Sequence, residues 1–190
     1  MNNTTRARRI REARGDFDRY LKGQGVDIGA GNDPLRIPQG NVIAWDQPQG
    51  DASRIEGVPD ASMDFVYSSH CLEHLQDLRL ALWNWMRVLK PQGILYVAVP
   101  DYRIYEKLNW PSPFNGDHKH SFSLELGRDK VKRQNHWHLD QDLRPLLESL
   151  GAEILAIHFE DDGYDYNRGF IDQTFDDSAL CQICVISRKR

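Results

Sequence analysis

Four of the seven histidines in the chain form two His-x-His pairs, His118 with His120 and His136 with His138. An imidazole ionises near neutral pH, so a histidine can take a proton from a hydroxyl group that is about to react. Histidines close to carboxylates can instead bind zinc or a related ion. The pattern leaves both chemistries open, as well as a third interpretation in which most of these side chains are structural or exposed.

A second candidate site is an apolar run that ends in two glycines, from Gly25 to Gly31. Gly29 and Gly31 have no β-carbon, so the backbone can turn sharply there and approach a bound molecule. The dinucleotide fingerprint requires a third glycine, and Pro34 stands in its place. Asp27 adds a carboxylate beside the loop, which suits a cationic or amine group better than a pyrophosphate. A plain strand-to-loop turn is the alternative.

The elements around this loop predict an α/β fold. Residues 41–46 are expected to form a second strand ending in Asp46, where a carboxylate can accept hydrogen bonds from both hydroxyls of a ribose. The segment Gly50-Asp51-Ala52 follows so soon that no helix and further strand fit between them, because a parallel crossover needs a dozen or more residues. One βα unit is therefore predicted to be reduced to a loop.

The rest of the chain supplies further strands and helices. Residues 63–68 predict a strand that runs into Ser69 and His70, and residues 78–89 show the clearest amphipathic helix. An apolar run at 94–99 is typical of a central parallel strand. After an irregular segment, a helix is expected over 139–150, with Pro145 marking a kink or a late start. Two last strands with no helix between them predict an antiparallel hairpin at the sheet edge.

The bulk properties exclude some classes of function. A chain of 190 residues with 40% hydrophobic residues supports a single domain, residues 1–190, with an N-terminal helix at 1–22. A net charge of −4 makes nucleic acid an unfavoured partner. No apolar run is long enough to span a membrane and no signal peptide is evident, so we expect a cytoplasmic protein. Cys181 and Cys184 lie on one predicted strand, where side chains three apart face opposite sides, so they are interpreted as ordinary buried thiols.

Five short segments stand in a characteristic order along the chain: Val26-Asp27-Ile28-Gly29-Ala30-Gly31, Asp46, Gly50-Asp51-Ala52, Ser69-His70-Cys71-Leu72-Glu73-His74-Leu75 and Arg87-Val88-Leu89-Lys90-Pro91-Gln92-Gly93. In this order they resemble class I S-adenosylmethionine-dependent methyltransferases, and most closely the group with the type 11 methyltransferase domain. The resemblance covers residues 25–101 well and the later helix and strand at 139–159 more loosely.

The resemblance implies a Rossmann-like, mostly parallel sheet with an antiparallel last strand and a pocket for S-adenosylmethionine. Gly29, Ala30 and Gly31 would lie along the methionine part, with Asp27 near its amine. Asp46 would hold the ribose, and Asp51 with the Ala52 backbone would meet the adenine. Ser68, Ser69 and His70 would close the pocket under the sulfonium, and residues 102–138 would form a lid over the acceptor site.

The leading hypothesis is O-methylation of a small-molecule or saccharide-like hydroxyl acceptor. Methyl transfer from a sulfonium is a direct displacement that depends on alignment, and a hydroxyl acceptor also needs a base. His120 is the first candidate for the base, followed by His118 and His70. No metal is assigned, although the set His118, His120, His136 and His138 leaves that question open, as it leaves open the oligomeric state. The alternatives are a non-catalytic S-adenosylmethionine-binding partner or regulatory protein, and a nucleic-acid or protein methyltransferase.

Overall fold

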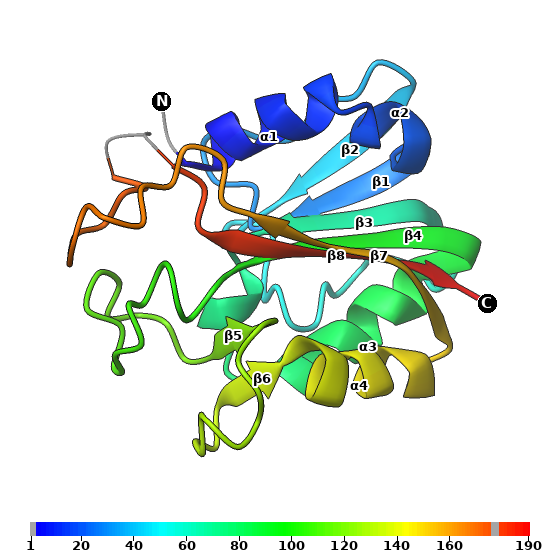
Figure 1. Ribbon diagram of the computed structural model, residues 1–190. Coiled ribbons are helices and arrows are strands. Elements are labelled where there is room, and N and C mark those ends of the chain that lie inside the picture. Colours follow the sequence, from blue (N-terminus) through cyan, green and yellow to red (C-terminus); the bar gives the residue numbers. More distant parts are fainter. Residues whose placement is uncertain (1–2, 176–178) are drawn as a thin grey trace.

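A computed structural model, which describes residues 3–175 and 179–190, shows a six-stranded sheet between two layers of helices (Figure 1). The sheet order is β2-β1-β3-β4-β8-β7. The first two residues of the predicted N-terminal helix lie outside the described part. The strands are β1 (Gly23–Ile28), β2 (Gly40–Trp45), β3 (Met63–Ser69), β4 (Leu89–Pro100), β7 (Ala152–Glu160) and β8 (Gln182–Lys189).

The sheet is parallel from β2 to β4 and antiparallel where β8 pairs with β4 and β7. The β7–β8 hairpin confirms the antiparallel edge that two successive strands predict. β2 is the edge strand on the other side, and the described chain between β2 and β3 runs through turns only. This confirms that one βα unit is reduced to a loop. The carboxyl ends of β1, β2, β3 and β4 therefore share one edge of the sheet.

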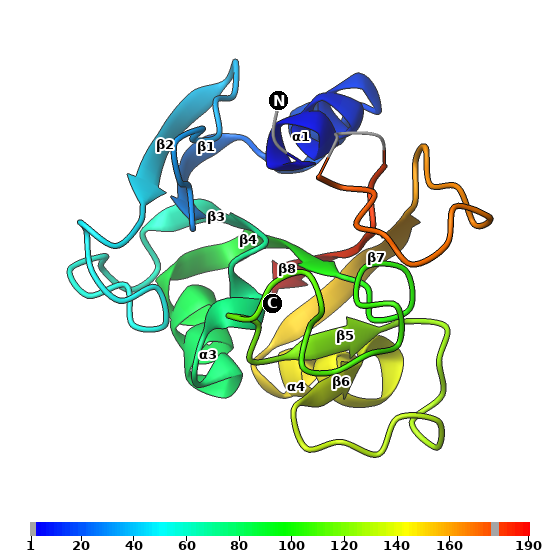
Figure 2. The same ribbon diagram turned by 90° about the vertical axis from the view of Figure 1, so that its left-hand side faces the viewer.

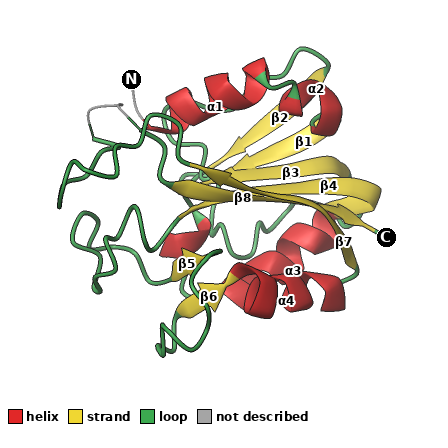
Figure 3. Ribbon diagram, viewed as in Figure 1, coloured by secondary structure: helices red, strands yellow, loops and turns green. Residues whose placement is uncertain are grey.

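Helices cover the two faces of the sheet differently (Figures 1 and 3). α1 (Asn3–Ala13) and α2 (Asp16–Tyr20) lie on one face; η1 (Leu72–His74), α3 (Leu78–Val88), η2 (Leu139–Leu143) and α4 (Arg144–Ser149) lie on the other side. Side chains alternate between these layers along β3. Phe65 and Tyr67 pack with Phe17 of α2, whereas Val66 packs in the larger core with α3.

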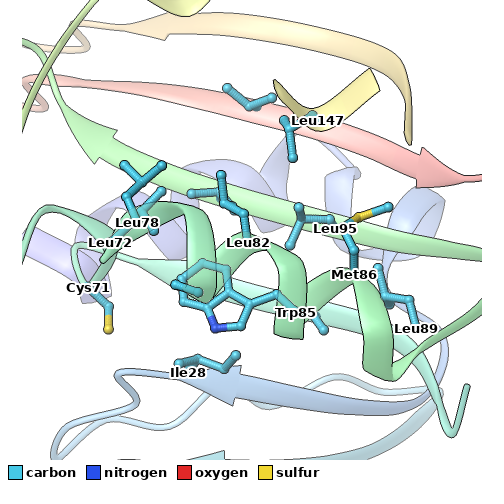
Figure 4. Packing of buried hydrophobic residues seen from close by; sticks show 14 of the residues in the cluster. Ile28, Cys71, Leu72, Leu78, Leu82, Trp85, Met86, Leu89, Leu95 and Leu147 are labelled. Atoms are coloured by element: carbon cyan, nitrogen blue, oxygen red, sulfur yellow. The ribbon is translucent and has the colours of Figure 1, made fainter. Parts of the chain in front are cut away.

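The larger core also positions the loop after β2. Trp85 of α3 is fully buried among Ile28, Leu82 and Leu95 (Figure 4). Its indole Nε1 donates a hydrogen bond of 2.8 Å to the carbonyl of Ala52, and Asn84 Nδ2 donates one of 2.9 Å to the carbonyl of Ser53. α3 thus fixes a loop that has no strand or helix of its own.

Two helices begin or end differently from the sequence prediction. The N-terminal helix expected over residues 1–22 is two helices, because Gly15 adopts a left-handed conformation with φ of 78° between α1 and α2. The helix expected from residue 139 starts with a π-helical turn, and regular α-helix begins only at Arg144. Pro145 stands in its first turn, where a missing N–H costs no hydrogen bond, so the late start is confirmed.

The insert between β4 and α4 has little regular structure. It contains β5 (Ser121–Ser123) and β6 (His136–His138), which pair in parallel as a small second sheet. Figure 2 views the molecule from the carboxyl ends of the parallel strands and shows the insert at this edge, beside α3 and α4. None of the described helices is long and apolar enough to cross a membrane.

Candidate active site

A cleft of about 540 Å³ opens at the carboxyl edge of the sheet. This is a typical volume for a small-molecule site, and the position is where open α/β sheets bind ligands. β1, β2 and β3 end at the cleft, and the insert supplies one wall. The lining residues are Gly29, Asp46, Gln47, Gly50, Asp51, Ala52, His70, Cys71, His74, Leu75, Asp117 and Lys119.

The glycine loop approaches the β3 end too closely for a side chain. Gly29 has a φ of 80°, and a β-carbon built on it would lie 2.6 Å from Cβ of Cys71. Its N–H donates to the carbonyl of Trp45 at 2.9 Å, which ties the loop to β2. Gly31 also has a positive φ, of 55°, but a β-carbon there would meet nothing within 4 Å. The glycine at position 29 is therefore required both by backbone conformation and by packing.

Two acidic side chains from the β2 side face the cleft. Asp46 follows β2 directly; its Oδ2 accepts a hydrogen bond of 2.7 Å from the N–H of Gly31, and its Oδ1 accepts one of 2.7 Å from the N–H of Gln47. A carboxylate offers about four lone-pair sites, so acceptor capacity is left for a ligand. Asp51 accepts from the N–H of Ser53 at 2.7 Å, and its exposed carboxylate lies 3.6 Å from Nε of Arg54.

His70 sits at the end of β3 in a left-handed conformation, with φ of 57°. Its Nε2 lies 2.5 Å from Oε1 of Gln182, and its Nδ1 lies 3.3 Å from Oε1 of Glu73. The amide nitrogen of Gln182 donates to Glu160, so the oxygen faces His70 and Nε2 must donate to it. Burial alone would lower the pKa of His70, but the nearby carboxylate of Glu73, with a contribution from Gln182, outweighs it and raises that pKa.

A second group of ionisable side chains surrounds Glu73. This carboxylate is fully buried, and neither oxygen has a hydrogen-bond partner. Nε2 of His74 lies 3.9 Å from its Oε1, and the ring of His74 packs edge-on against His118 with centroids 4.8 Å apart. His118 is itself buried, with Nδ1 2.6 Å from Oε1 of Glu106.

The remaining histidines of the two pairs stabilise the insert. Nδ1 of His120 accepts a hydrogen bond of 3.1 Å from the indole of Trp137. His136 bridges Ser121 and Ser123 across the small sheet at 2.8 and 2.9 Å. Nδ1 of His138 accepts from the N–H of Gln141 at the start of η2. Burial and then the nearby Arg133 lower the pKa of His136 to about 4, so it is neutral near pH 7.

Asp27 lies behind the glycine loop, in a small cavity under α1. It shares that cavity with Ala30, Tyr67 and Ser69. The carboxylate is 4% exposed and accepts one hydrogen bond of 2.7 Å, from the N–H of Leu35. Burial raises its pKa to about 6, although that hydrogen bond acts in the opposite direction. The folded chain therefore holds a carboxylate that is costly to charge.

This cost predicts a pH-dependent gain in stability for Asp27→Asn. Because the folded pKa is raised above the ordinary value of about 4, the penalty is absent at low pH, grows as the pH rises from 4 to 6, and is constant above 6. The variant should raise the free energy of unfolding at pH 7.5 by about 1–3 kcal/mol, with the gain shrinking toward pH 4. Urea unfolding across this pH range measures it, with exposed Asp18→Asn as the control; a gain that does not vary with pH would contradict the prediction.

The structure brings only part of the sequence-predicted site to one cleft. Gly29, Asp46, Asp51, Ala52 and His70 line it together. Ala30 and Gly31 line a neighbouring hollow that shares Asp46 with the cleft. Asp27 and Ser69 face the cavity under α1, and Ser68 is fully buried, donating to the carbonyl of Ile28. His118 and His120 are not among the lining residues.

Sequence reasoning missed several side chains that the fold brings to this region. Gln47 and Lys119 line the cleft. Gln182 and Glu160 hold His70 from β8 and β7, and Glu106 holds His118 from the insert. For Glu106 the sequence offers one weak signal, which is that an acidic residue lies near the histidine pairs. For Gln182 and Glu160 the chain gives no local pattern, because they reach the site through sheet order.

Comparison with known proteins agrees with this geometry. Residues 25–97 match the family model described as a methyltransferase domain. The matched segment runs from β1 into β4 and so contains the glycine loop, Asp46, Asp51 and His70. The match implies S-adenosylmethionine as the cofactor. No curated protein matches the chain.

Solved structures show that the whole chain has the fold of class I methyltransferases. A Thermotoga maritima S-adenosylmethionine-dependent methyltransferase, described as a possible histamine N-methyltransferase, aligns over 95% of this chain and 89% of its own with a TM-score of 0.61 and 20% identity. An S-adenosylmethionine-dependent methyltransferase from Archaeoglobus fulgidus aligns over 96% and 94%, with a TM-score of 0.57 and 16% identity. A third match, over 98% and 96%, is the methyltransferase component of a complex with the Trm112 activator of Haloferax volcanii, with a TM-score of 0.55 and 12% identity.

Proposed function

We propose that this protein transfers the methyl group of S-adenosylmethionine to a hydroxyl oxygen of a small or saccharide-like acceptor. The observation that carries the cofactor part is the cleft itself, where a glycine loop without room for a side chain faces two carboxylates on the β2 side. When bound, S-adenosylmethionine supplies an electrophilic methyl group on a sulfonium. The chain contributes binding and alignment, which is the main requirement for direct displacement.

The residues fit the cofactor in chemical type. Asp46 has acceptor capacity beyond its two backbone hydrogen bonds and would hold the ribose hydroxyls. Asp51 and the backbone at Ala52, which α3 fixes through Trp85, would meet the adenine. Asp27 would face the ammonium of the methionine part, directly or across the glycine loop. A buried carboxylate that costs stability when charged supports such a role, because perturbed groups concentrate at functional sites.

The acceptor would enter from the insert side. Asp117 and Lys119 of residues 102–138 line the cleft opposite the glycine loop, which supports the proposal that this segment covers the acceptor. The open cleft and the net charge of −4 favour a small neutral or cationic acceptor over nucleic acid. O-methylation and a saccharide-like acceptor are our own inference, since the similar solved structures carry different functional descriptions.

Of the three histidines proposed to act on the acceptor, His70 has the most suitable position. It lines the cleft, whereas His118 and His120 are each buried with one ring nitrogen engaged by the insert. Both nitrogens of His70 face oxygen atoms, of Gln182 and Glu73. His70 would therefore orient the acceptor or the methyl group, and it offers no vacant nitrogen to take a proton.

Calorimetry with S-adenosylmethionine, S-adenosylhomocysteine and NAD tests the proposal. We expect both sulfur compounds to bind with one site per chain, and NAD not to bind, because Pro34 replaces the third glycine of the dinucleotide fingerprint. Failure of both sulfur compounds to bind would refute the cofactor assignment. Binding without methylation of any hydroxyl acceptor in a panel of sugars and polyols would favour the alternative, a non-catalytic S-adenosylmethionine-binding or regulatory protein.

A further inference from the structure

We propose that Glu73, His74 and His118 form a binding site for a divalent transition-metal ion, of which Zn²⁺ is the best chemical match. Each side chain offers one ligand atom, and the three atoms lie within 4.8 Å of one another. Among the described residues this is the one cluster of that composition. Two imidazoles and one carboxylate are a donor set that zinc and related ions accept, with a further position open to another ligand.

The first observation behind this site is the state of Glu73. Its side chain is fully buried, yet neither carboxylate oxygen receives a hydrogen bond. A buried charge without hydrogen bonds is costly, so such groups are normally paired or bound to a metal. The nearest imidazoles are those of His70, at 3.3 Å, and His74, at 3.9 Å. A metal ion would engage the oxygen lone pairs of Glu73 that the ion pair with His70 leaves without a hydrogen bond.

The second observation is that each histidine is oriented from behind by a carboxylate. Nδ1 of His118 lies 2.6 Å from buried Glu106, and Nδ1 of His74 lies 3.1 Å from Asp117. Both Nδ1 atoms then carry the proton, and both Nε2 atoms are left with a free lone pair. Metal-binding histidines are held in this way, because the outer carboxylate fixes the tautomer and makes the ligand nitrogen more basic.

The geometry needs only a small closure to bind an ion. Metal–nitrogen distances of 2.0–2.1 Å place ligand atoms of a tetrahedral zinc site about 3.3 Å apart. The present separations of up to 4.8 Å would shorten by about 1–1.5 Å. His74 can supply this movement, since it is the last residue of the short η1 turn and is partly exposed.

The site would present its open position to the cleft, because His74 and its partner Asp117 line it. The role there rests on the proposed function: the ion would bind the acceptor hydroxyl and lower its pKa. The hydroxyl proton would pass to water in the cleft and the oxygen would attack the methyl carbon. The carbon–sulfur bond would break with its electron pair remaining on sulfur, giving S-adenosylhomocysteine. This would supply the activation for which His70 has no vacant nitrogen.

Metal binding is tested on the full chain after chelator treatment, by calorimetric titration with Zn²⁺ and by absorption spectra with Co²⁺. We expect one ion per chain and cobalt d–d bands typical of nitrogen and oxygen ligands. His74→Ala should weaken Zn²⁺ binding by about 100-fold or more, and Glu106→Gln, which disturbs only the support of His118, by about 10–100-fold. His158→Ala, on β7, is the matched control and should bind like the unmodified chain.

Three results would overturn the site. If the unmodified chain binds neither Zn²⁺ nor Co²⁺, the three side chains do not form a metal site. Binding unchanged in His74→Ala would place the ion elsewhere, and a thiolate-to-cobalt charge-transfer band would indicate a cysteine ligand. Calorimetry of the metal-free chain with S-adenosylhomocysteine separates the two proposals, because loss of metal binding should leave cofactor binding intact.

Discussion

Replacing Arg11 by alanine should lower the free energy of unfolding by about 3 kcal/mol, a folded-to-unfolded ratio reduced more than a hundredfold. Arg11 is completely buried, although it stands among five arginines in α1 and its flanks. Its Nη2 lies 2.9 Å from Oε2 of Glu160, and its Nη1 donates to the hydroxyl of Tyr67 at 2.7 Å. Removing one member of a buried pair leaves the other charge without compensation.

This expected loss in the free energy of unfolding is at the lower end of the range that is usual for breaking a buried ion pair, because Arg14 also pairs with Glu160. Arg9→Ala is the matched control, since Arg9 is an exposed arginine on the same helix and should change stability by less than about 0.5 kcal/mol. Urea unfolding followed by circular dichroism measures both. Equal stabilities of the two variants would contradict the assignment of Arg11 as the buried anchor of α1.

The difference in the free energy of unfolding between the unmodified chain and Arg11→Ala should depend on pH in a definite direction. Burial would raise the pKa of Glu160, but Arg11, Gln182 and Arg14 outweigh it and lower that pKa to about 2. The pair therefore stabilises the fold above the ordinary glutamate pKa of about 4.3, and this contribution disappears as the pH falls through 4 toward 2. The stability gap between the unmodified chain and Arg11→Ala should narrow over the same interval.

Arg11 also shows where sequence reasoning reached its limit. Arginine side chains are mostly exposed in folded proteins, and four of the five in α1 and its flanks are at least partly exposed. Nothing in the local pattern marks Arg11, because its partner is 149 residues away on β7. The same holds for Gln182, which connects Glu160 to His70 through β8. Contacts of this kind depend on the order of the strands, so they can be recognised only when the β7–β8 hairpin is known to lie beside β4.

Features with a local cause were predicted correctly. The glycine loop, the carboxylate after β2, the missing βα unit and the α3 helix each follow from spacing, composition or periodicity over a few residues. Asp46 and His70 meet at the cleft because parallel strands end at one edge, which the sequence pattern does imply. The insert was not predictable in this way: its histidines carry no periodicity, and hydrogen bonds to Trp137 and Ser121 decide where they lie.

Replacing Asp46 by alanine should weaken S-adenosylhomocysteine binding by about 100-fold. A carboxylate that accepts hydrogen bonds from both ribose hydroxyls contributes about 1.5–3 kcal/mol for each bond, part of which water replaces. The side chain also accepts the N–H of Gly31 at 2.7 Å, so its loss loosens the glycine loop as well. Calorimetry measures the affinity, and Glu56→Ala, which removes an exposed acid far along the same loop, controls for net charge.

A thermodynamic cycle separates contact with the ribose from support of the loop. The 2′-deoxy analogue of S-adenosylhomocysteine should bind the unmodified chain about tenfold more weakly than the parent compound, since one charge-assisted hydrogen bond is lost. In Asp46→Ala the two compounds should bind alike, because no carboxylate remains to distinguish them. If the analogue is still disfavoured in the variant, another group holds the ribose, and Asp46 acts only through Gly31. Unchanged affinity for the parent compound in Asp46→Ala would refute the ribose assignment altogether, and with it the orientation of the cofactor across this cleft.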